Sequence, residues 1–274
     1  MKEDNIETKF TLDYSEPLLY LAIHNGHHVS DHIARKIGIS EFDRLREEDP
    51  YTEKFILDKP NHIIQYTSRF EYDLNREKGI FYQKPSDCWG LPIYPFESLD
   101  DFEKHSAYEK YEIFYFELIS AIYKFLQTYD RIIILDIHSY NHRRNGKLAN
   151  FDDNSENPEI IIGTNHYQEL GSSWKAIIDD FESVLKEQAF VGVFPNRSNS
   201  SPYLDVRQNV KFSGGYLSRF INQKFKGNVC CISIEFQKFW MNEWTGEVHD
   251  ECLLLLKKIF DEAVERVLLK AVSK

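Results

Sequence analysis

Residues 132–137 read Ile-Ile-Ile-Leu-Asp-Ile, a mostly apolar run that the polar residues His138 and Ser139 follow. A short continuous apolar run is typical of a strand that is buried on both faces of a parallel sheet. Two further segments have the same character, LLYLAI at residues 18–23 and NVCCISIE at residues 228–235. We expect these three segments to be strands of one sheet.

Weaker strand patterns and helical patterns fill the intervals between these runs. The weaker strand patterns lie at residues 63–66, 159–163 and 190–194, and helical spacing of apolar residues lies at residues 108–129, 172–188 and 249–272. Strands that alternate with helices predict a mostly parallel sheet with both faces covered. The chain has 274 residues and shows neither a linker nor a repeat. We therefore expect a single three-layer α/β/α domain over residues 1–274.

The composition excludes several classes of protein. A hydrophobic content of 42%, with 20 Phe and 16 Tyr, excludes a mainly disordered chain. No apolar run approaches the roughly 20 residues of a membrane span, and the opening MKEDNIETKF lacks the apolar stretch of a secretory signal. The net charge of −11 argues against binding to nucleic acid. We expect a cytoplasmic protein with neither nucleic acid nor membrane as a partner.

The cysteines predict no metal or disulfide motif. Cys88, Cys230, Cys231 and Cys252 contain no C-x-x-C pair. The adjacent Cys230 and Cys231 would point to opposite faces of a strand. We expect small apolar core residues in a reducing compartment.

Polar residues stand at the ends of the three best strand patterns. His24 follows the first, His138 follows the second, and Glu235 closes the third. In open α/β sheets, ligands bind beyond the carboxyl ends of the strands. A lone histidine is more often a hydrogen-bonded core residue, but two histidines and a carboxylate form a common zinc site with an open fourth position. Asp136 would face the same side as His138 and could orient a histidine or the substrate.

Two segments near these strands allow more than one interpretation. In HNGHH at residues 24–28, Gly26 permits a sharp exit from the strand, and His27 is a weaker candidate ligand. In SRFEYDLNRE at residues 68–77, the basic residues could belong to a solvated turn paired with acidic neighbours. Alternatively, Arg69 and Arg76 could bind a carboxylate or an oxyanion. Spacing alone favours the solvated turn.

Two loop-rich stretches follow the candidate site segments, at residues 79–101 and 141–158. Long loops in compact domains are usually functional or floppy. Their place after the site segments favours a functional role.

Six short motifs occur in a fixed order along the chain. They are HNG at residues 24–26, EEDPYTEKF at 47–55, DLNR at 73–76, DIHS at 136–139, KFSGGYLSR at 211–219 and IEF at 234–236. In this order they resemble the N-formylglutamate amidohydrolase (deformylase) family, which is related to zinc carboxypeptidases and aspartoacylases. The resemblance covers residues 18–246. It implies an α/β/α fold of the zinc-exopeptidase, phosphorylase/hydrolase-like type and one zinc ion per chain.

The resemblance also implies a set of metal ligands. His24 and His138 would be two of the ligands. The related carboxypeptidases take their first two ligands from H-x-x-E, but position 27 is His in this chain. An acidic residue further along would supply the remaining ligand, which indicates Asp49, with Glu48 and His27 as the alternatives.

By the same resemblance, Glu235 would be the general base, and Arg69 would polarise the scissile carbonyl and hold its oxyanion.

The family pattern implies substrate-binding residues as well. Asn75 and Arg76 would hold a substrate carboxylate, together with Arg219 or Arg143. The turn of Gly214, Gly215 and Tyr216 would lie on the substrate side of the site, although its simpler interpretation is a helix start.

The function implied by the resemblance is hydrolysis of a small anionic N-acyl amino acid. The simplest substrate is N-formylglutamate, which would give formate and glutamate in amino-acid degradation. One alternative is a carboxypeptidase-like enzyme or another deacylase of the same superfamily, since the loop at residues 141–158 allows a different acyl group. Another is a catalytically silent binding protein, which the presence of His24, His138 and Glu235 disfavours.

Overall fold

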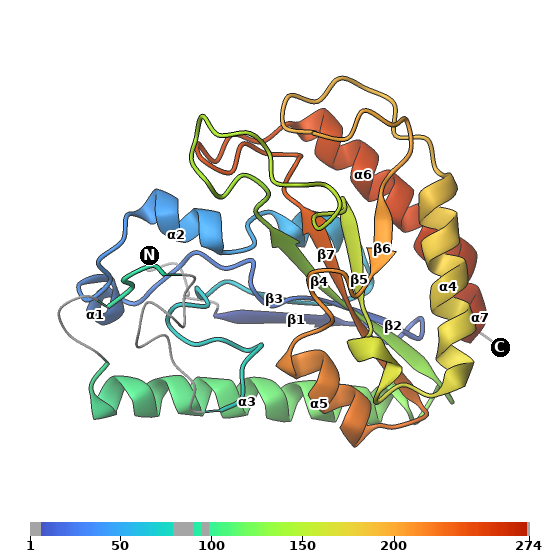
Figure 1. Cartoon of the computed structure of the whole chain (residues 1–274). Coiled ribbons are helices and arrows are strands. Elements are labelled where there is room, and N and C mark those ends of the chain that lie inside the picture. The colour runs from blue at the N-terminus through green and yellow to red at the C-terminus, as the bar shows by residue number, and fades with distance from the viewer. Residues whose placement is uncertain (1–6, 79–89, 95–98, 273–274) are drawn as a thin grey trace.

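A seven-stranded sheet forms the centre of the computed structural model, which describes residues 7–78, 90–94 and 99–272 (Figure 1). The strand order is β1-β3-β2-β4-β7-β5-β6. β1 pairs antiparallel with β3, and β5 pairs antiparallel with β7, whereas the other four pairings are parallel. The predicted, mostly parallel sheet is therefore confirmed. The strands are β1 (Thr8–Leu12), β2 (Leu18–Ala22), β3 (Asn61–Gln65), β4 (Ile132–Tyr140), β5 (Ile160–Gly163), β6 (Val206–Gln208) and β7 (Val229–Gln237).

Helices cover both faces of the sheet, as predicted. One face carries α3 and α5, and the other carries α4, α6 and α7 (Figure 1). The helices are α1 (Asp31–Ala34), α2 (Glu41–Glu47), α3 (Asp101–Phe125), α4 (Ser172–Glu187), α5 (Tyr216–Lys224), α6 (Asp250–Ala263) and α7 (Lys270–Val272), with a π-helix at Val264–Leu269 and 3-10 helices at Thr52–Phe55 and Asn165–Tyr167. Among the described residues, none of these helices is both long and apolar enough to cross a membrane.

Two apolar cores lie on the two sides of the central strands. Cys230 packs in the core under α4 and α6, and Cys231 packs in the core under α3 and α5. The predicted opposite orientation of these neighbours is confirmed. Cys252 is also a buried core residue, whereas Cys88 lies outside the described residues.

The start of α3 shows why the helical pattern underestimated its length. The Asp100 side chain accepts from the backbone N–H of Glu103 at 2.9 Å, and Glu103 accepts from the backbone N–H of Asp100 at 2.7 Å. This capping box provides hydrogen-bond acceptors for two backbone N–H groups that have no partner within the helix. It starts the helix at Asp101, seven residues before the predicted start at residue 108.

The predicted strand at residues 190–194 is wrong, because this segment is an irregular loop. Phe190 is buried against Phe194 and Phe239, so its apolar character serves the core without strand pairing. A Cβ atom on Gly192 would lie 2.4 Å from the ring of Phe194, a contact that only glycine avoids. Residues 141–158 form a loop, as predicted, and much of the loop predicted at residues 79–101 lies outside the described residues.

The register of the sheet brings the three predicted strand ends together. β2 and β4 are neighbours in parallel, with Leu21 opposite Asp136. β4 and β7 are also parallel neighbours, with His138 opposite Glu235. The carboxyl ends of β2, β4 and β7 therefore meet at one edge of the sheet, as the ends of adjacent parallel strands must.

Candidate metal centre and substrate pocket

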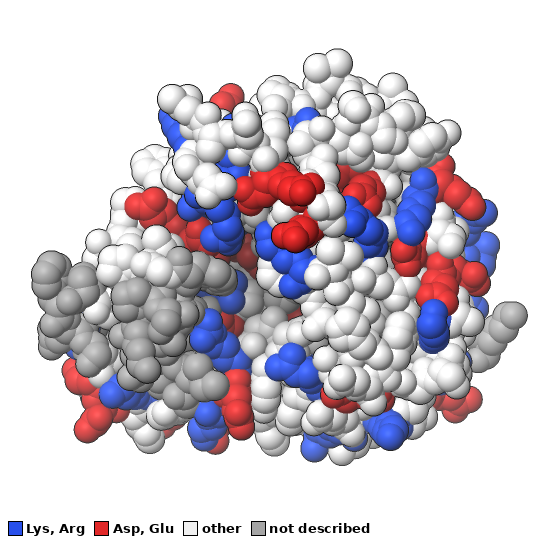
Figure 2. Space-filling view, in the orientation of Figure 1, with Lys and Arg blue, Asp and Glu red and all other residues white. Residues whose placement is uncertain are grey.

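A pocket of about 350 Å³ opens at this edge of the sheet. The molecule is hollowed near the middle of the face in view, with Lys and Arg side chains at the edge of the hollow (Figure 2). A volume of this size suits a small molecule. Among the predicted site residues, those that line the pocket are His24, Asp49, Arg69, Asn75, His138, Gly214, Gly215 and Glu235.

His24, Asp49 and His138 form a compact group in this pocket. Oδ2 of Asp49 lies 3.4 Å from Nδ1 of His24 and 2.9 Å from Nδ1 of His138. One potential ligand atom from each residue lies within 4.8 Å of the others, and all three residues are buried. Within the described part of the chain, this is the one group of His, Cys, Asp or Glu with the geometry to hold a metal ion.

The backbone around Asp49 is fixed to the strand ends. α2 ends at Glu47, and the backbone N–H of Asp49 donates to the carbonyl of His24 at 3.0 Å. The fully buried ammonium of Lys238 donates to the carbonyls of Arg46 at 2.7 Å and Glu48 at 2.6 Å. The carboxylate of Asp49 is therefore held beside the two histidines by contacts from residues that follow β2 and β7, His24 and Lys238.

The outer nitrogen of each histidine faces a buried carboxylate. Nε2 of His24 lies 2.6 Å from Oδ1 of Asp73, and Nε2 of His138 lies 2.9 Å from Oδ2 of Asp136. Such carboxylates fix the tautomer and the ring orientation of a metal-ligating histidine. Nδ1 of His24 is buried and has no hydrogen-bond partner among the described residues. Both Nδ1 atoms are thus presented to the centre of the group.

The sequence predicted that Asp136 could orient a histidine. For Asp73 it indicated only an ion pair in a solvated turn. The signal for Asp73 was present in the sequence, because it opens the DLNR motif.

The alternative ligands Glu48 and His27 are engaged elsewhere. Oε2 of Glu48 pairs with Nδ1 of His27, and its Oε1 accepts hydrogen bonds from Arg44 at 3.1 Å and from the hydroxyl of Ser68. The His27 side chain is 38% exposed, in contrast to the buried His24 and His138. Neither Glu48 nor His27 belongs to the His-Asp-His group.

The charges of the group suit a divalent cation. Burial alone would raise the pKa of Asp49, but the neighbouring imidazoles of His138 and His24 hold the pKa well below its usual range. Burial alone would lower the pKa of His138, but the carboxylates of Asp136 and Glu235 raise it well above its usual value. Carboxylates gathered around two histidines favour positive charge at this point, which protons or a metal ion can supply.

Glu235 lies beside the group on β7, directly opposite His138 in the sheet register. Burial raises the pKa of its carboxyl group to about 7, with the charge of His138 acting against this and that of Asp49 adding to it. A carboxyl group with a pKa near neutrality can both accept and release a proton at physiological pH.

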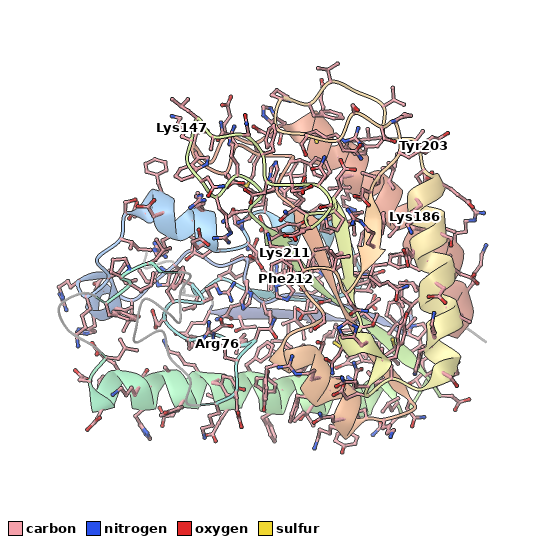
Figure 3. All side chains as sticks on the ribbon, in the orientation of Figure 1. Arg76, Lys147, Lys186, Tyr203, Lys211 and Phe212 are labelled. Carbon is pink, nitrogen blue, oxygen red and sulfur yellow. The ribbon has the colours of Figure 1, made fainter. Side chains whose placement is uncertain are left out.

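The DLNR segment is not a solvated turn, so that interpretation is wrong. Asp73 is buried and lies 2.9 Å from NH2 of Arg69 and 3.5 Å from Nε of Arg76. Arg69 lines the pocket, whereas Arg76 does not. The side chain of Arg76 lies on the α3 side of the site, and its carbonyl accepts from the hydroxyl of Tyr111 at 2.9 Å (Figure 3).

Asn75 is packed against the start of α5. Its Oδ1 accepts from the backbone N–H of Leu217 at 3.0 Å. A Cβ atom on Gly215 would lie 2.1 Å from the Asn75 carboxamide, so the close approach requires glycine. The helix-start interpretation is confirmed, since α5 begins at Tyr216. Neither Tyr216 nor Arg219 lines the pocket, and Arg219 instead donates to the carbonyl of Gly214 at 2.9 Å.

Arg143 does not line the pocket, but its neighbour Arg144 does. The backbone N–H of Arg143 donates to Glu243 at 3.2 Å, and its guanidinium lies over the ring of Phe151. With Arg143 fixed in this way, Arg144 faces the pocket. Sequence spacing alone does not show which of two adjacent arginines in an irregular loop faces the pocket.

Further pocket residues were not predicted from the sequence. Lys238 follows the IEF motif, and Lys211 and Phe212 open the KFSGGYLSR motif, so sequence signals lay close to all three. Ser139 follows His138 within β4, and Asn141 follows the end of that strand. The remaining unpredicted residues that line the pocket are Glu47, Tyr140, Arg144 and Ser213.

Comparison with known proteins agrees with this architecture. The family model for N-formylglutamate amidohydrolase matches residues 16–241. The chain belongs to the N-formylglutamate amidohydrolase family. No curated protein matches the chain in sequence.

Two solved structures share the fold of this family member. A crystal structure of N-formylglutamate amidohydrolase from Ralstonia eutropha JMP134 superposes with a TM-score of 0.69 at 15% sequence identity, covering 97% of this chain and 98% of that one. A gene product of Agrobacterium tumefaciens superposes with a TM-score of 0.62 at 16% identity, covering 94% of this chain and 95% of that one. At such low identity the structural likeness supports the fold, and the family model supports the membership.

Proposed function

We propose that this chain is a zinc-dependent amidohydrolase that removes the acyl group from an N-acyl amino acid. The expected substrate is N-formylglutamate, which gives formate and glutamate. The observation that carries the proposal is the buried group of His24, Asp49 and His138 beside Glu235, in a pocket that also holds Arg69 and Asn75. Membership of an amidohydrolase family supports the same reaction class.

The His-Asp-His group fits zinc, because two imidazoles and one carboxylate leave a fourth position open. Zinc bound there would act as a Lewis acid that polarises a carbonyl oxygen and lowers the pKa of water to about 7. The chain's own contribution is orientation. Asp73 and Asp136 face the Nε2 atoms of the two histidines, so that the Nδ1 atoms are the ones that would bind the ion.

Glu235 is the proposed general base. Its carboxylate would accept a proton from the attacking water and return it to the leaving nitrogen, which amide cleavage requires. A pKa near 7 suits both steps, since the group is then neither too weak as a base nor too weak as an acid.

Arg69 and Asn75 are the proposed substrate contacts near the metal. Arg69 is braced by Asp73 at 2.9 Å and would stabilise the oxyanion that develops on the scissile carbonyl. Because Oδ1 of Asn75 accepts from Leu217, the amide nitrogen of Asn75 is its donor toward a substrate carboxylate. Arg76 would act on this pair through Asp73.

The alternative of a carboxypeptidase-like enzyme or another deacylase rests on the loop at residues 141–158, which supplies Arg144 to the pocket wall. A silent binding protein would be expected to lack the proposed base or a proposed ligand, whereas Glu235, His24 and His138 are all present.

The test is hydrolysis of a panel of N-formyl, N-acetyl and peptidyl amino acids by zinc-loaded protein. We expect the highest kcat/KM for N-formylglutamate. Preference for another acyl group would favour the alternative deacylase, and absence of hydrolysis across the panel would contradict the proposed function.

A further inference from the structure

The outer face of α3 carries exposed apolar side chains. Ile113, Phe116, Ser120 and Tyr123 follow one another at intervals of three, four and three residues, which places them on one face of the helix. Phe102 lies about four turns before Phe116 on the same face. The four apolar side chains are between 54% and 76% exposed. Figure 1 shows α3 along the lower edge of the molecule, with the sheet above it.

The side of α3 that faces the sheet is apolar as well. Phe114, Leu118 and Ile122 are buried in the core beneath this helix. A surface helix normally carries polar residues on its outer face, whereas a helix that is apolar all round is buried. The hydroxyl of Ser120 donates to the carbonyl of Phe116 at 2.8 Å, so this small side chain needs no partner outside the helix. The outer face of α3 therefore has the composition of a contact surface.

The size of this apolar face fits a dimer interface. An aromatic side chain has about 150–250 Å² of surface, so Phe102, Ile113, Phe116 and Tyr123 together expose on the order of 500 Å². An interface of standard size buries about 800 Å² of each partner, of which roughly 60% is apolar. The exposed apolar area of α3 is thus what one partner contributes to such an interface.

The charges of this face differ between its two halves. The exposed charged residues of α3 are Asp101, Glu109, Glu112, Glu117 and Lys124, with His105 beside them. The half before Phe116 is therefore acidic, and Lys124 lies in the half after it. The ammonium of Lys124 lies 4.0 Å from the centre of the Tyr14 ring, and among the described residues no carboxylate pairs with it. An acidic group on a partner would complement Lys124.

The acidic half of α3 has such groups. Glu109 pairs with His105 at 3.3 Å and Glu112 pairs with Lys78, but both glutamates remain more than half exposed. If two copies of α3 pack antiparallel about a twofold axis beside Phe116, Lys124 of one copy lies level with position 108 of the other, next to Glu109. Parallel packing would instead place each acidic half against itself.

We propose that the outer face of α3 is the contact between two copies of this chain, packed antiparallel about a twofold axis beside Phe116. The same patch then serves both copies, as an interface with twofold symmetry requires. This inference goes beyond the proposed function, and its test needs neither metal nor substrate.

The experiment is sedimentation equilibrium of the full chain. Interfaces of standard size have dissociation constants from micromolar to picomolar, so the parent should have twice the mass of one chain at micromolar concentration. Phe116→Asp places two like charges at the axis and should raise the dissociation constant by about 30-fold or more, the effect of a central interface residue.

Phe42→Asp is the matched control. Phe42 lies on α2 and is 68% exposed, so the same substitution should leave the parent's mass unchanged. Circular dichroism of both variants shows whether they fold. The proposal is overturned by a parent that stays monomeric up to about 100 μM, including one that uses Phe116 to bind neutral lipid vesicles. A Phe116 variant that dimerises as tightly as the parent would overturn it as well.

Cysteine crosslinking tests the orientation of the two helices. Phe116→Cys lies beside the axis and should give a disulfide-linked dimer on mild oxidation. Phe102→Cys lies about 21 Å from the axis along the helix, so its two copies would be about 42 Å apart, too far for a disulfide. The parent measures any crosslink through the native cysteines. Crosslinking of both variants would overturn the antiparallel arrangement, and crosslinking of neither would overturn the position of the axis.

Discussion

Nε2 of His24 lies 2.6 Å from Oδ1 of Asp73, although 49 positions separate the two residues in the chain. The same carboxylate accepts from Arg69 at 2.9 Å and from the backbone N–H of Asn75 at 2.8 Å. One buried acid therefore orients a candidate metal ligand and two residues proposed to contact the substrate. A substitution of Asp73 should therefore affect both metal binding and substrate binding in the pocket.

Asp73→Asn keeps the size of the side chain and removes its charge. We expect zinc affinity to fall by about 10–100-fold, the usual effect of losing a carboxylate behind a ligating histidine. A competition titration with a zinc chelator measures this change. Asp180→Asn, on the exposed side of α4, is the matched control and should retain the parent affinity. Equal affinities for all three proteins would show that Asp73 does not support the metal site.

The ligand set predicts the zinc content of the purified protein. The parent should carry close to one zinc ion per chain, and His24→Ala, Asp49→Ala and His138→Ala should each lose most of it. His27→Ala should retain zinc, because His27 pairs with Glu48 outside the group. Atomic absorption measures the content. If the His27 variant loses zinc and the Asp49 variant retains it, His27 is the ligand and Asp49 is not.

Glu235→Gln tests the proposed base. The amide is isosteric but cannot transfer the proton, so kcat should fall by about 10²–10⁴ while zinc content is unchanged. Steady-state rates on the best substrate, with the metal content measured in parallel, distinguish the roles. Loss of zinc from a folded variant would make Glu235 a ligand, and an unchanged rate would exclude it from the mechanism.

Glu243, which accepts a hydrogen bond from the backbone N–H of His142, should make the stability of the fold depend on pH. Burial would raise the pKa of Glu243, but hydrogen bonds from the side chain and the backbone of His142 lower it to about 2, from an ordinary 4.5. A lowered pKa means that the carboxylate stabilises the fold above about pH 4.5, and that this contribution is lost as the pH falls through 2.

Glu243→Gln should therefore lower the free energy of unfolding at pH 7 by about 2–3 kcal/mol, with a smaller difference from the parent below pH 4.5. Urea unfolding at pH 7, 4.5 and 3 measures it. The exposed Glu247→Gln is the control and should follow the parent at each pH. If the free energies of unfolding of Glu243→Gln and the parent differ as much at pH 3 as at pH 7, the proposed role of the Glu243 carboxylate is contradicted.

The central strands could be predicted from the sequence because each is a continuous apolar run. The predicted bounds of β2, β4 and β7 lie within three residues of the observed ones, and the polar residues His24, His138 and Glu235 at or near their carboxyl ends fall at one edge of the sheet. Short edge strands lack this signal. β1 is partly exposed and β6 has three residues, so neither is marked by a run of buried residues.

The candidate site also contains residues that could be predicted from the sequence and residues that could not. His24, His138 and Glu235 were predictable because strand ends in a parallel sheet converge. Asp49 required the family resemblance, since it lies in a loop after α2 and reaches the site through tertiary contacts alone. Arg144 and Lys211 were missed because the direction of a loop side chain depends on contacts, such as that between Arg143 and Glu243, that sequence spacing does not encode.

The central place of β7 has a consequence for biosynthesis. Of the described strands, β7 is the last in the chain, yet it lies between β4 and β5. It carries Glu235, and Lys238 follows it directly. His24, Asp49 and His138 leave the ribosome well before it, without Glu235 and without the ammonium of Lys238 that holds the Asp49 segment. The site of a nascent chain is thus incomplete until β7 has been inserted into the sheet, and chains truncated before β7 would be released without Glu235 and Lys238.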